Sequence, residues 1–269
     1  MIDQSPEPRA DSAARTPRSE ILRASAAGSV CWAISLFGLY GQLQLLGPIM
    51  ERFGALEGMV GQLYSLENGA FFSTILLASG PLARVSRTRT ALLGVLLYAV
   101  GNVASVYAGS LDALVLARVV AGVGSGLVGA AGTASAASAI APERVFAIIT
   151  VVHNLLLSAQ FKALPYVLEE ADPSGGYLLM AGAGVVMMPF FFWLLPPRSN
   201  GDAGEGLATL LLAAPNRRLA VVALLGIFIY ETAQSGVFAF VDQLGIRAGI
   251  DKYARGDALS VTGFVGLVG

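Results

Sequence analysis

Long stretches without a charged residue recur along the chain, and their length predicts its structure. Four of them, at residues 24–50, 90–111, 119–142 and 173–197, contain 27, 22, 24 and 25 residues. A helix needs roughly 20 mostly apolar residues to cross the hydrocarbon core of a bilayer. Each stretch is therefore predicted to be a membrane-spanning helix, because lipid offers no partner to the backbone of an open strand.

Three further apolar segments are interrupted by ionisable side chains. They lie at about residues 59–82, 145–167 and 219–241, and they contain Glu67, His153, Lys162 and Glu231. A last apolar stretch runs from residue 258 to 269, and its 12 residues would reach only ~18 Å as a helix. That length cannot cross the bilayer. We therefore expect a fragment that ends within an eighth span, rather than a last helix that lies in the interface.

The composition supports a membrane protein and argues against other classes. Of the 269 residues, 55% are hydrophobic and only 13% are charged, whereas soluble domains are nearer a quarter charged. Mean hydropathy is +0.68. A net charge of −1 without a basic block argues against a nucleic-acid partner. Cys31 is the single cysteine, which excludes an internal disulfide and a Cys-rich metal site.

The distribution of charge predicts the orientation and the domain organisation. Residues 1–23 are rich in Pro, Ser, Ala and charge and are predicted to form a disordered tail. Eleven Lys and Arg lie in this tail and in the connections after spans two, four and six, against four on the other side. The positive-inside rule then places the N-terminus in the cytoplasm, in a multi-pass protein of the inner or plasma membrane. We expect a six-helix bundle at 24–196, a cytoplasmic linker at 197–218 and the start of a second bundle at 219–269.

Ionisable and amide side chains within the spans are the candidate functional residues, because each is costly in lipid. Glu67 is expected in the outer half of span two. Arg118 lies about one and a half turns into span four from the same side. A Glu67–Arg118 pair would therefore remove two unpaired charges at once. Gln42 and Gln44 of span one are expected at the same depth.

Each of these residues also has a structural interpretation. Glu67 and Glu231 can be partnered residues that only hold helices together, and Lys162 can extend toward the membrane surface. His153 beside Asn154 favours hydrogen bonding to a neighbouring helix, with a proton relay as the alternative. There is no second histidine, so a His-based metal site is not expected.

Glycines form a second pattern, in span four. Gly124, Gly126 and Gly129 fit GxGxxG, but a dinucleotide-binding loop needs a strand before it and a helix start after it. Here the glycines lie inside an uncharged span. Together with Gly122 they predict a small-residue face that lets another helix approach closely. Gly122, Gly124 and Gly126 are therefore predicted to be helix-packing residues.

An arginine a third of the way into span four, followed by glycines four, six and eight residues later, resembles the fourth-helix motif of the major facilitator superfamily. A second resemblance lies between spans two and three. There, residues 80–89 (GPLARVSRTR) are similar to the family's cytoplasmic Gly-x-Leu-Ala-Asp-Arg-x-Gly-Arg loop. The aspartate is absent here, and the arginines align only if one residue is dropped. The resemblance assigns Gly80, Arg84, Arg87 and Arg89 to a gating loop.

The resemblance implies an all-α integral membrane protein, with a six-helix N-terminal bundle of this family and the first one to two helices of the C-terminal half. It implies a secondary active transporter of a small solute working by alternating access. The cavity would be lined by spans one, four and seven, with Gln42, Gln44, Arg118 and Glu231 as binding candidates. Glu67 and Glu231 are candidate proton carriers.

The expected partners are the lipid bilayer, a small-molecule substrate, protons and the missing C-terminal half, with no nucleic acid, cofactor or metal. The sequence lacks GxxxxGK[ST], so energy would come from a gradient rather than from ATP. It also lacks HExxH and paired aspartates within the spans, which argues against an intramembrane enzyme. The alternative is a non-transporting membrane sensor or scaffold, or an inactive transporter fragment.

Overall fold

The computed structural model describes residues 17–80, 82, 85–170, 173–196, 216–219, 221–223, 225–226, 229, 233, 237 and 240–266. Its elements are α1 (Pro17–Phe53), α2 (Glu57–Ser79), α3 (Arg87–Val106), α4 (Leu111–Ala137), α5 (Pro142–Glu170), α6 (Pro173–Met187), the 3-10 helix η2 (Met188–Trp193), α9 (Val241–Arg247) and α10 (Lys252–Val265). The first six predicted spans correspond to α1–α6. Most of the predicted seventh span, Glu231 included, lies outside the described residues.

Five of the described helices are long and apolar enough to cross a membrane. They are α1, α3, α4, α5 and the continuous segment of α6 and η2. α2 has 23 residues, a comparable length, but it contains Gln62, Glu67 and Asn68, which reduce its hydropathy. The polar residues of α2 thus include a candidate functional carboxylate, Glu67.

Three boundaries differ from the sequence-based expectation. α1 begins at Pro17, so residues 17–23 are helical rather than part of a disordered tail. Proline suits the first helical position, where its missing N–H costs no hydrogen bond. α6 ends at Met187 and the chain continues as the 3-10 helix η2 from Met188. Pro189 within η2 lacks the N–H that an α-helix would use. α10 begins at Lys252, because the Asp251 side chain caps it by accepting from two backbone N–H groups.

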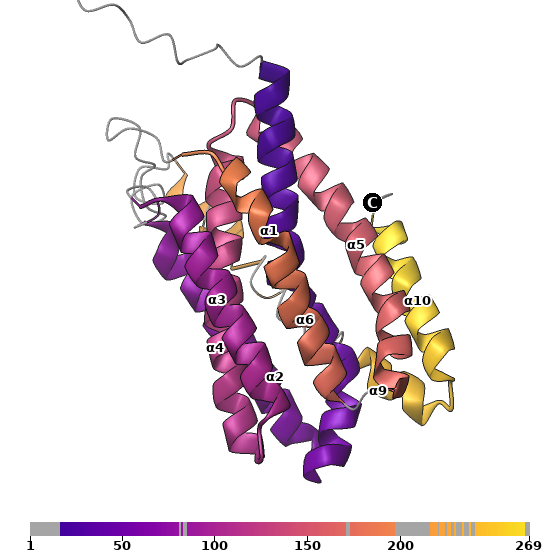
Figure 1. Cartoon of the computed structure of the whole chain (residues 1–269). Helices are drawn as coiled ribbons and strands as arrows, with labels where there is room; N and C mark the ends of the chain where they lie inside the picture. The colour runs from indigo at the N-terminus through magenta and orange to yellow at the C-terminus, as the bar shows by residue number, and fades with distance from the viewer. Residues whose placement is uncertain are drawn as a thin grey trace, which may run out of the picture.

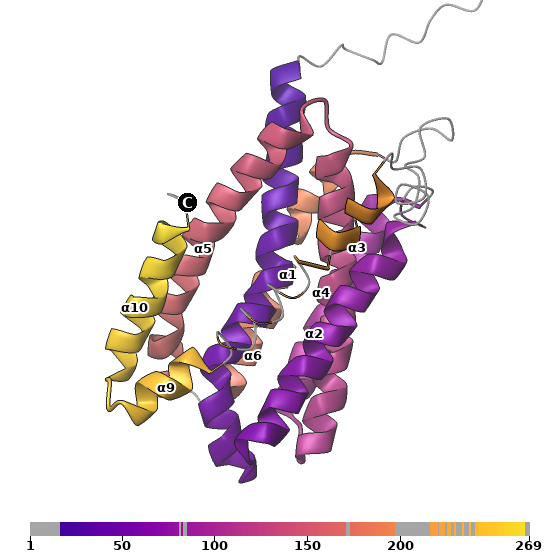
Figure 2. The ribbon, with the colours of Figure 1, turned by 180° about the vertical axis from the view of Figure 1, so that it is seen from behind.

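The helices form two groups joined by α1 and α6. α4 packs along both α2 and α3, α1 packs along α4 and α5, and α6 packs along α3 and α1. α10 lies along α5 in both views (Figures 1 and 2). The start of α1 lies at the opposite end of the bundle from α9 and the start of α10 (Figure 1). We call these two ends the Pro17 end and the Phe53 end.

The glycines of α4 lie where it meets its two neighbours. A Cβ atom on Gly122 would lie 2.5 Å from the carbonyl oxygen of Glu67 in α2. Gly126, one turn further along, faces α2 as well. A Cβ atom on Gly124 would lie 2.6 Å from the carbonyl oxygen of Gly94 in α3. These backbone contacts are the close approach that the small-residue face of α4 predicts.

Candidate functional site

The centre of the candidate site is an ion pair between α4 and α2. Arg118 is fully buried and Glu67 is 4% exposed. The Nε atom of Arg118 donates to Oε2 of Glu67 at 3.0 Å, and Nη2 donates to Oε1. Two parallel hydrogen bonds between a guanidinium and a carboxylate are stronger and more directional than a single one. The structure thus brings together the two charges that the sequence suggests as partners.

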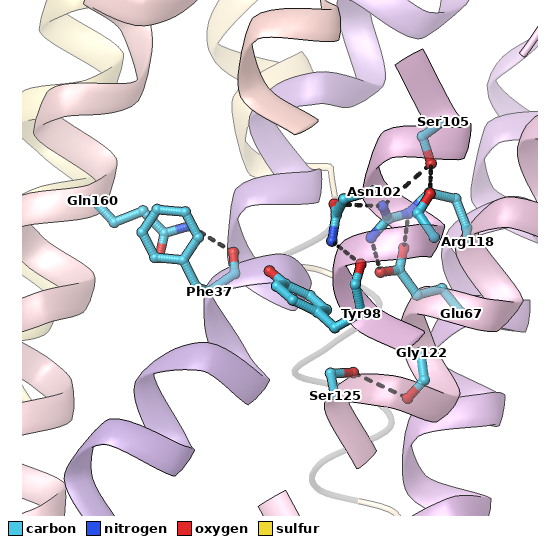
Figure 3. A network of polar contacts seen from close by, with 10 residues as sticks. Phe37, Glu67, Tyr98, Asn102, Ser105, Arg118, Gly122, Ser125 and Gln160 are labelled. Carbon is cyan, nitrogen blue, oxygen red and sulfur yellow. Dashed lines mark hydrogen bonds and ion pairs between the residues drawn. The ribbon is translucent and has the colours of Figure 1, made fainter. Parts of the chain in front are cut away.

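Two other helices complete the surroundings of the guanidinium. From α3, Asn102 accepts through Oδ1 from Nη1 of Arg118 at 2.9 Å, and Ser105 accepts through Oγ at 3.5 Å (Figure 3). From α6, the ring of Tyr177 lies 5.1 Å from Cζ of Arg118, within cation–π range. One side chain of α4 therefore contacts α2, α3 and α6.

The positions of Asn102 and Ser105 follow from the periodicity of α3. They are three residues apart and so lie on one face of the helix. Asn102 donates to the carbonyl oxygen of Tyr98 at 2.8 Å, and Ser105 donates to that of Gly101 at 2.8 Å. These bonds use the donors and leave the acceptor oxygens for Arg118. A side chain on Gly101 would collide with the α4 backbone, so this glycine lets α3 come close enough for the contact.

The pair is an electrostatic unit rather than two independent charges. Removing either charge from water is costly, and the mutual attraction in a medium of low dielectric offsets that cost only when the geometry is good. Removing one partner would leave the other charged and buried. The arrangement can therefore hold four helices together, or respond to a proton on Glu67.

Gln42 and Gln44, both from α1, point to different neighbours. Gln42 is fully buried and lies beside Tyr177, although none of the described residues forms a regular hydrogen bond with its amide. Gln44 donates through Nε2 to the carbonyl oxygen of Phe161 in α5 at 3.2 Å. Gln42 therefore adjoins the Arg118 group through Tyr177, whereas Gln44 belongs to the α1–α5 contact.

His153 lies elsewhere, against aromatic rings of α1. Its ring centroid is 6.2 Å from that of Trp32 and 5.8 Å from that of Tyr40. It also lines a pocket of about 270 Å³ between α1, α5 and α6. Asn154, the next residue, faces Gly263 and Gly266 at the end of α10. The two neighbours thus serve different contacts, and the described interaction of His153 is aromatic packing.

The predicted gating loop is only partly described. Gly80 follows the last residue of α2 and is exposed, and Arg84 lies outside the described residues. Ser86 caps α3, accepting from the backbone N–H of Arg89 at 3.4 Å. Arg89 is exposed and Arg87 is 4% exposed. Arg87 and Arg89, which the resemblance assigns to the same loop, therefore have opposite environments: one is buried and the other is exposed.

Arg87 binds the end of the sixth span. It donates through Nη1 to the carbonyl oxygen of Leu195 at 3.2 Å and through Nη2 to Oγ of Ser138 at 2.7 Å. Arg23 of α1 donates to the carbonyl oxygens of Trp193 at 2.6 Å and Leu194 at 3.1 Å. Carbonyls at a helix end lack intrahelical partners. Two arginines, from α1 and α3, supply those partners here.

A second set of charges joins α2 and α5 to the C-terminal part of the chain. Lys162 of α5 pairs with Asp257 of α10 at 2.6 Å, and Arg247 of α9 pairs with Glu57 of α2. Lys162 therefore has a partner rather than only extending toward the membrane surface. Gly256 of α10 packs against α5, where a Cβ atom would lie 2.9 Å from a carbonyl oxygen.

The sequence did not identify Asn102, Ser105, Tyr177 or Asp257 as site residues. Asn102 and Ser105 had a usable signal, since two polar residues three apart inside an apolar span mark one polar face. Tyr177 and Asp257 had none, because their roles depend on how helices distant in sequence are placed.

The chain matches the Major Facilitator Superfamily over residues 28–269. It belongs to this family. With its membrane-length helices, it is a multi-pass membrane protein of a transporter family. A comparison with curated proteins found no match.

Solved structures with a similar fold are transporters. A POT family transporter in complex with a thioalcohol-conjugated peptide is 14% identical with a TM-score of 0.53, over 78% of this chain and 46% of that chain. The peptide transporter POT in complex with sulfate is 16% identical with a TM-score of 0.54, over 85% and 49%. The chain spans about half the length of these transporters. At such identities the likeness concerns the fold alone.

Proposed function

We propose that the chain acts in a secondary active transporter that moves a small solute by alternating access, with Glu67 as a proton-coupling carboxylate. The observation that carries the proposal is the Glu67–Arg118 pair inside the bundle of a transporter family member. A buried charged pair is a weak source of stability, because its desolvation cost is large. Ionisable residues within spans are, by contrast, typical of ion and proton pathways.

Protonation of Glu67 would change the forces on α2. The ionised carboxylate accepts two hydrogen bonds from Arg118. A neutral carboxylic acid would weaken both and leave the guanidinium buried with Asn102, Ser105 and Tyr177 as its remaining contacts. Because Gly122 brings the α4 backbone against the carbonyl of Glu67, a change at this pair bears directly on the α2–α4 contact.

Alternating access requires the two halves to meet at one end of the bundle at a time. Two ion pairs join the N-terminal helices to the described C-terminal helices. The Arg247–Glu57 pair lies at the Phe53 end, and the Lys162–Asp257 pair lies on the contact between α5 and α10, which starts at that end. This arrangement supports a conformation closed at the Phe53 end. With the cytoplasmic N-terminus that the charge distribution predicts, the closed end would face away from the cytoplasm.

Proton-coupled transport can be measured in proteoliposomes loaded with a pH-sensitive dye. The external solution carries candidate solutes, one class at a time, starting with dipeptides, sugars and organic acids. We expect one class to drive dye-reported proton movement in the unmodified full-length transporter that contains this chain. We expect Glu67→Gln to abolish this movement, because the amide cannot take up and release a proton. Glu143→Gln is the matched control, since Glu143 is exposed at the start of α5.

The full enclosure of Arg118 favours a second interpretation, in which the pair only holds α2, α3, α4 and α6 together. In that case Glu67→Gln would lower thermal stability and leave proton-coupled movement intact in the folded fraction. Solute movement that is independent of the proton gradient would contradict the coupling role of Glu67. If no solute class drove proton movement, proton-coupled transport itself would be contradicted.

A further inference from the structure

A groove of about 450 Å³ lies between α2 and α3, close to the Pro17 end. Both helices pack along α4 but scarcely touch each other, so Leu127 of α4 contributes to the lining. Leu77 and Ala78 of α2 and Leu93 of α3 line the groove as well. Its volume is within the range of small-ligand sites, about 300–1,000 Å³. We call this feature the α2–α3 groove.

The sides of the α2–α3 groove are open to the surroundings of the bundle. Leu77 is 75% exposed and Leu93 is 51% exposed. In a protein that spans a bilayer, aliphatic side chains exposed at this depth lie against hydrocarbon chains rather than water. The groove is therefore suited to an extended aliphatic chain.

Among the described residues that line the groove, Arg89 carries the positive charge, at the rim of this apolar surface. Arg89, in the first turn of α3, lines the groove and is exposed. None of the described residues accepts a hydrogen bond from its guanidinium. Arg87, two residues earlier, is instead buried against Leu195 and Ser138. The start of a helix also carries a partial positive charge, so the rim attracts an anion.

We propose that the α2–α3 groove binds an anionic phospholipid. One acyl chain lies against Leu77, Ala78 and Leu93, and the phosphate pairs with Arg89. Guanidinium groups match phosphate oxygens in geometry and form charge-assisted hydrogen bonds with them. The charge distribution of the sequence predicts that this end faces the cytoplasm, where the leaflet carries anionic lipid.

Native mass spectrometry of the full chain in detergent micelles tests the proposal. The purified chain is titrated with phosphatidylglycerol or with phosphatidylcholine of the same acyl chains, and the bound lipids are counted. We expect phosphatidylglycerol to bind preferentially, and Arg89→Gln to weaken it about tenfold, as expected for loss of a hydrogen bond to a charged group. Arg89→Lys should retain most of the binding.

Two further variants separate the parts of the site. Arg144→Gln removes an exposed charge at the start of α5, at the same end of the bundle but outside the groove, and should leave binding unchanged. Ala78→Phe fills the groove without altering charge and should weaken both lipids. Equal binding of the two lipids would overturn the proposal, as would unchanged binding in Arg89→Gln. Equal losses in Arg89→Gln and Arg144→Gln would also overturn it.

Discussion

Lys162 on α5 and Asp257 on α10 form an ion pair of 2.6 Å, although 95 residues separate them in the chain. Both side chains are more than half exposed, so the pair contributes little to stability by itself. Its significance is positional, because it lies on the contact between the six-helix bundle and the C-terminal helices. The packing of Gly256 against α5 places the two backbones close together along the same contact.

Reversing one of these charges should loosen α10. In Lys162→Glu two carboxylates would face each other, and we expect backbone amides of α10 to exchange with deuterium several-fold faster. The double variant Lys162→Glu/Asp257→Lys should restore the slower exchange. If the double variant exchanged as fast as the single one, the pair would not be holding α10.

Breaking the Glu67–Arg118 pair should be far more costly. We expect Glu67→Gln to lower the free energy of unfolding by about 3–5 kcal/mol, because it leaves a buried guanidinium without its counter-ion. Glu67→Leu combined with Arg118→Met should cost less than the sum of the two single changes. Thermal unfolding in detergent, followed by tryptophan fluorescence, measures both. Strict additivity would mean that the two residues do not interact.

The glycines of α4 provide a test of close helix packing. Gly124→Ala should lower stability by roughly 1–3 kcal/mol, since the added methyl group would meet the α3 backbone. Gly182→Ala in α6 is the matched control. Its methyl group would enter open space, and alanine should stabilise the helix by about 0.5–1 kcal/mol. Similar effects of the two changes would contradict the packing role of Gly124.

Arg87 should be a structural residue of the Pro17 end. Arg87→Ala removes the hydrogen bonds to Leu195 and Ser138, and we expect a loss of about 1.5–3 kcal/mol. Arg144→Ala, an exposed arginine at the same end, should change stability by no more than about 0.5 kcal/mol. Thermal unfolding of the two variants in one detergent checks this difference, and equal melting temperatures would contradict it.

The Glu67–Arg118 pair could be inferred from the sequence, because two charges inside apolar spans at one depth need a partner. Gln42 and Gln44 show where such inference ended. Their expected depth in the membrane grouped both with Arg118. However, residues two apart on a helix point about 200° apart around its axis. Only one of the two could face the Arg118 group, and the packing of α1 decided that it was Gln42.

The sequence by itself determined the membrane class, the positions of six helices and the small-residue face of α4. These properties are local, since hydropathy, length and glycine spacing can be read from one segment without its neighbours. Only the tertiary structure decided that Asn102, Ser105 and Tyr177 surround Arg118, that Arg87 turns inward while Arg89 stays exposed, and that Lys162 meets Asp257. Such contacts depend on the rotation and crossing of helices far apart in the chain, and many side chains across the molecule set that geometry jointly.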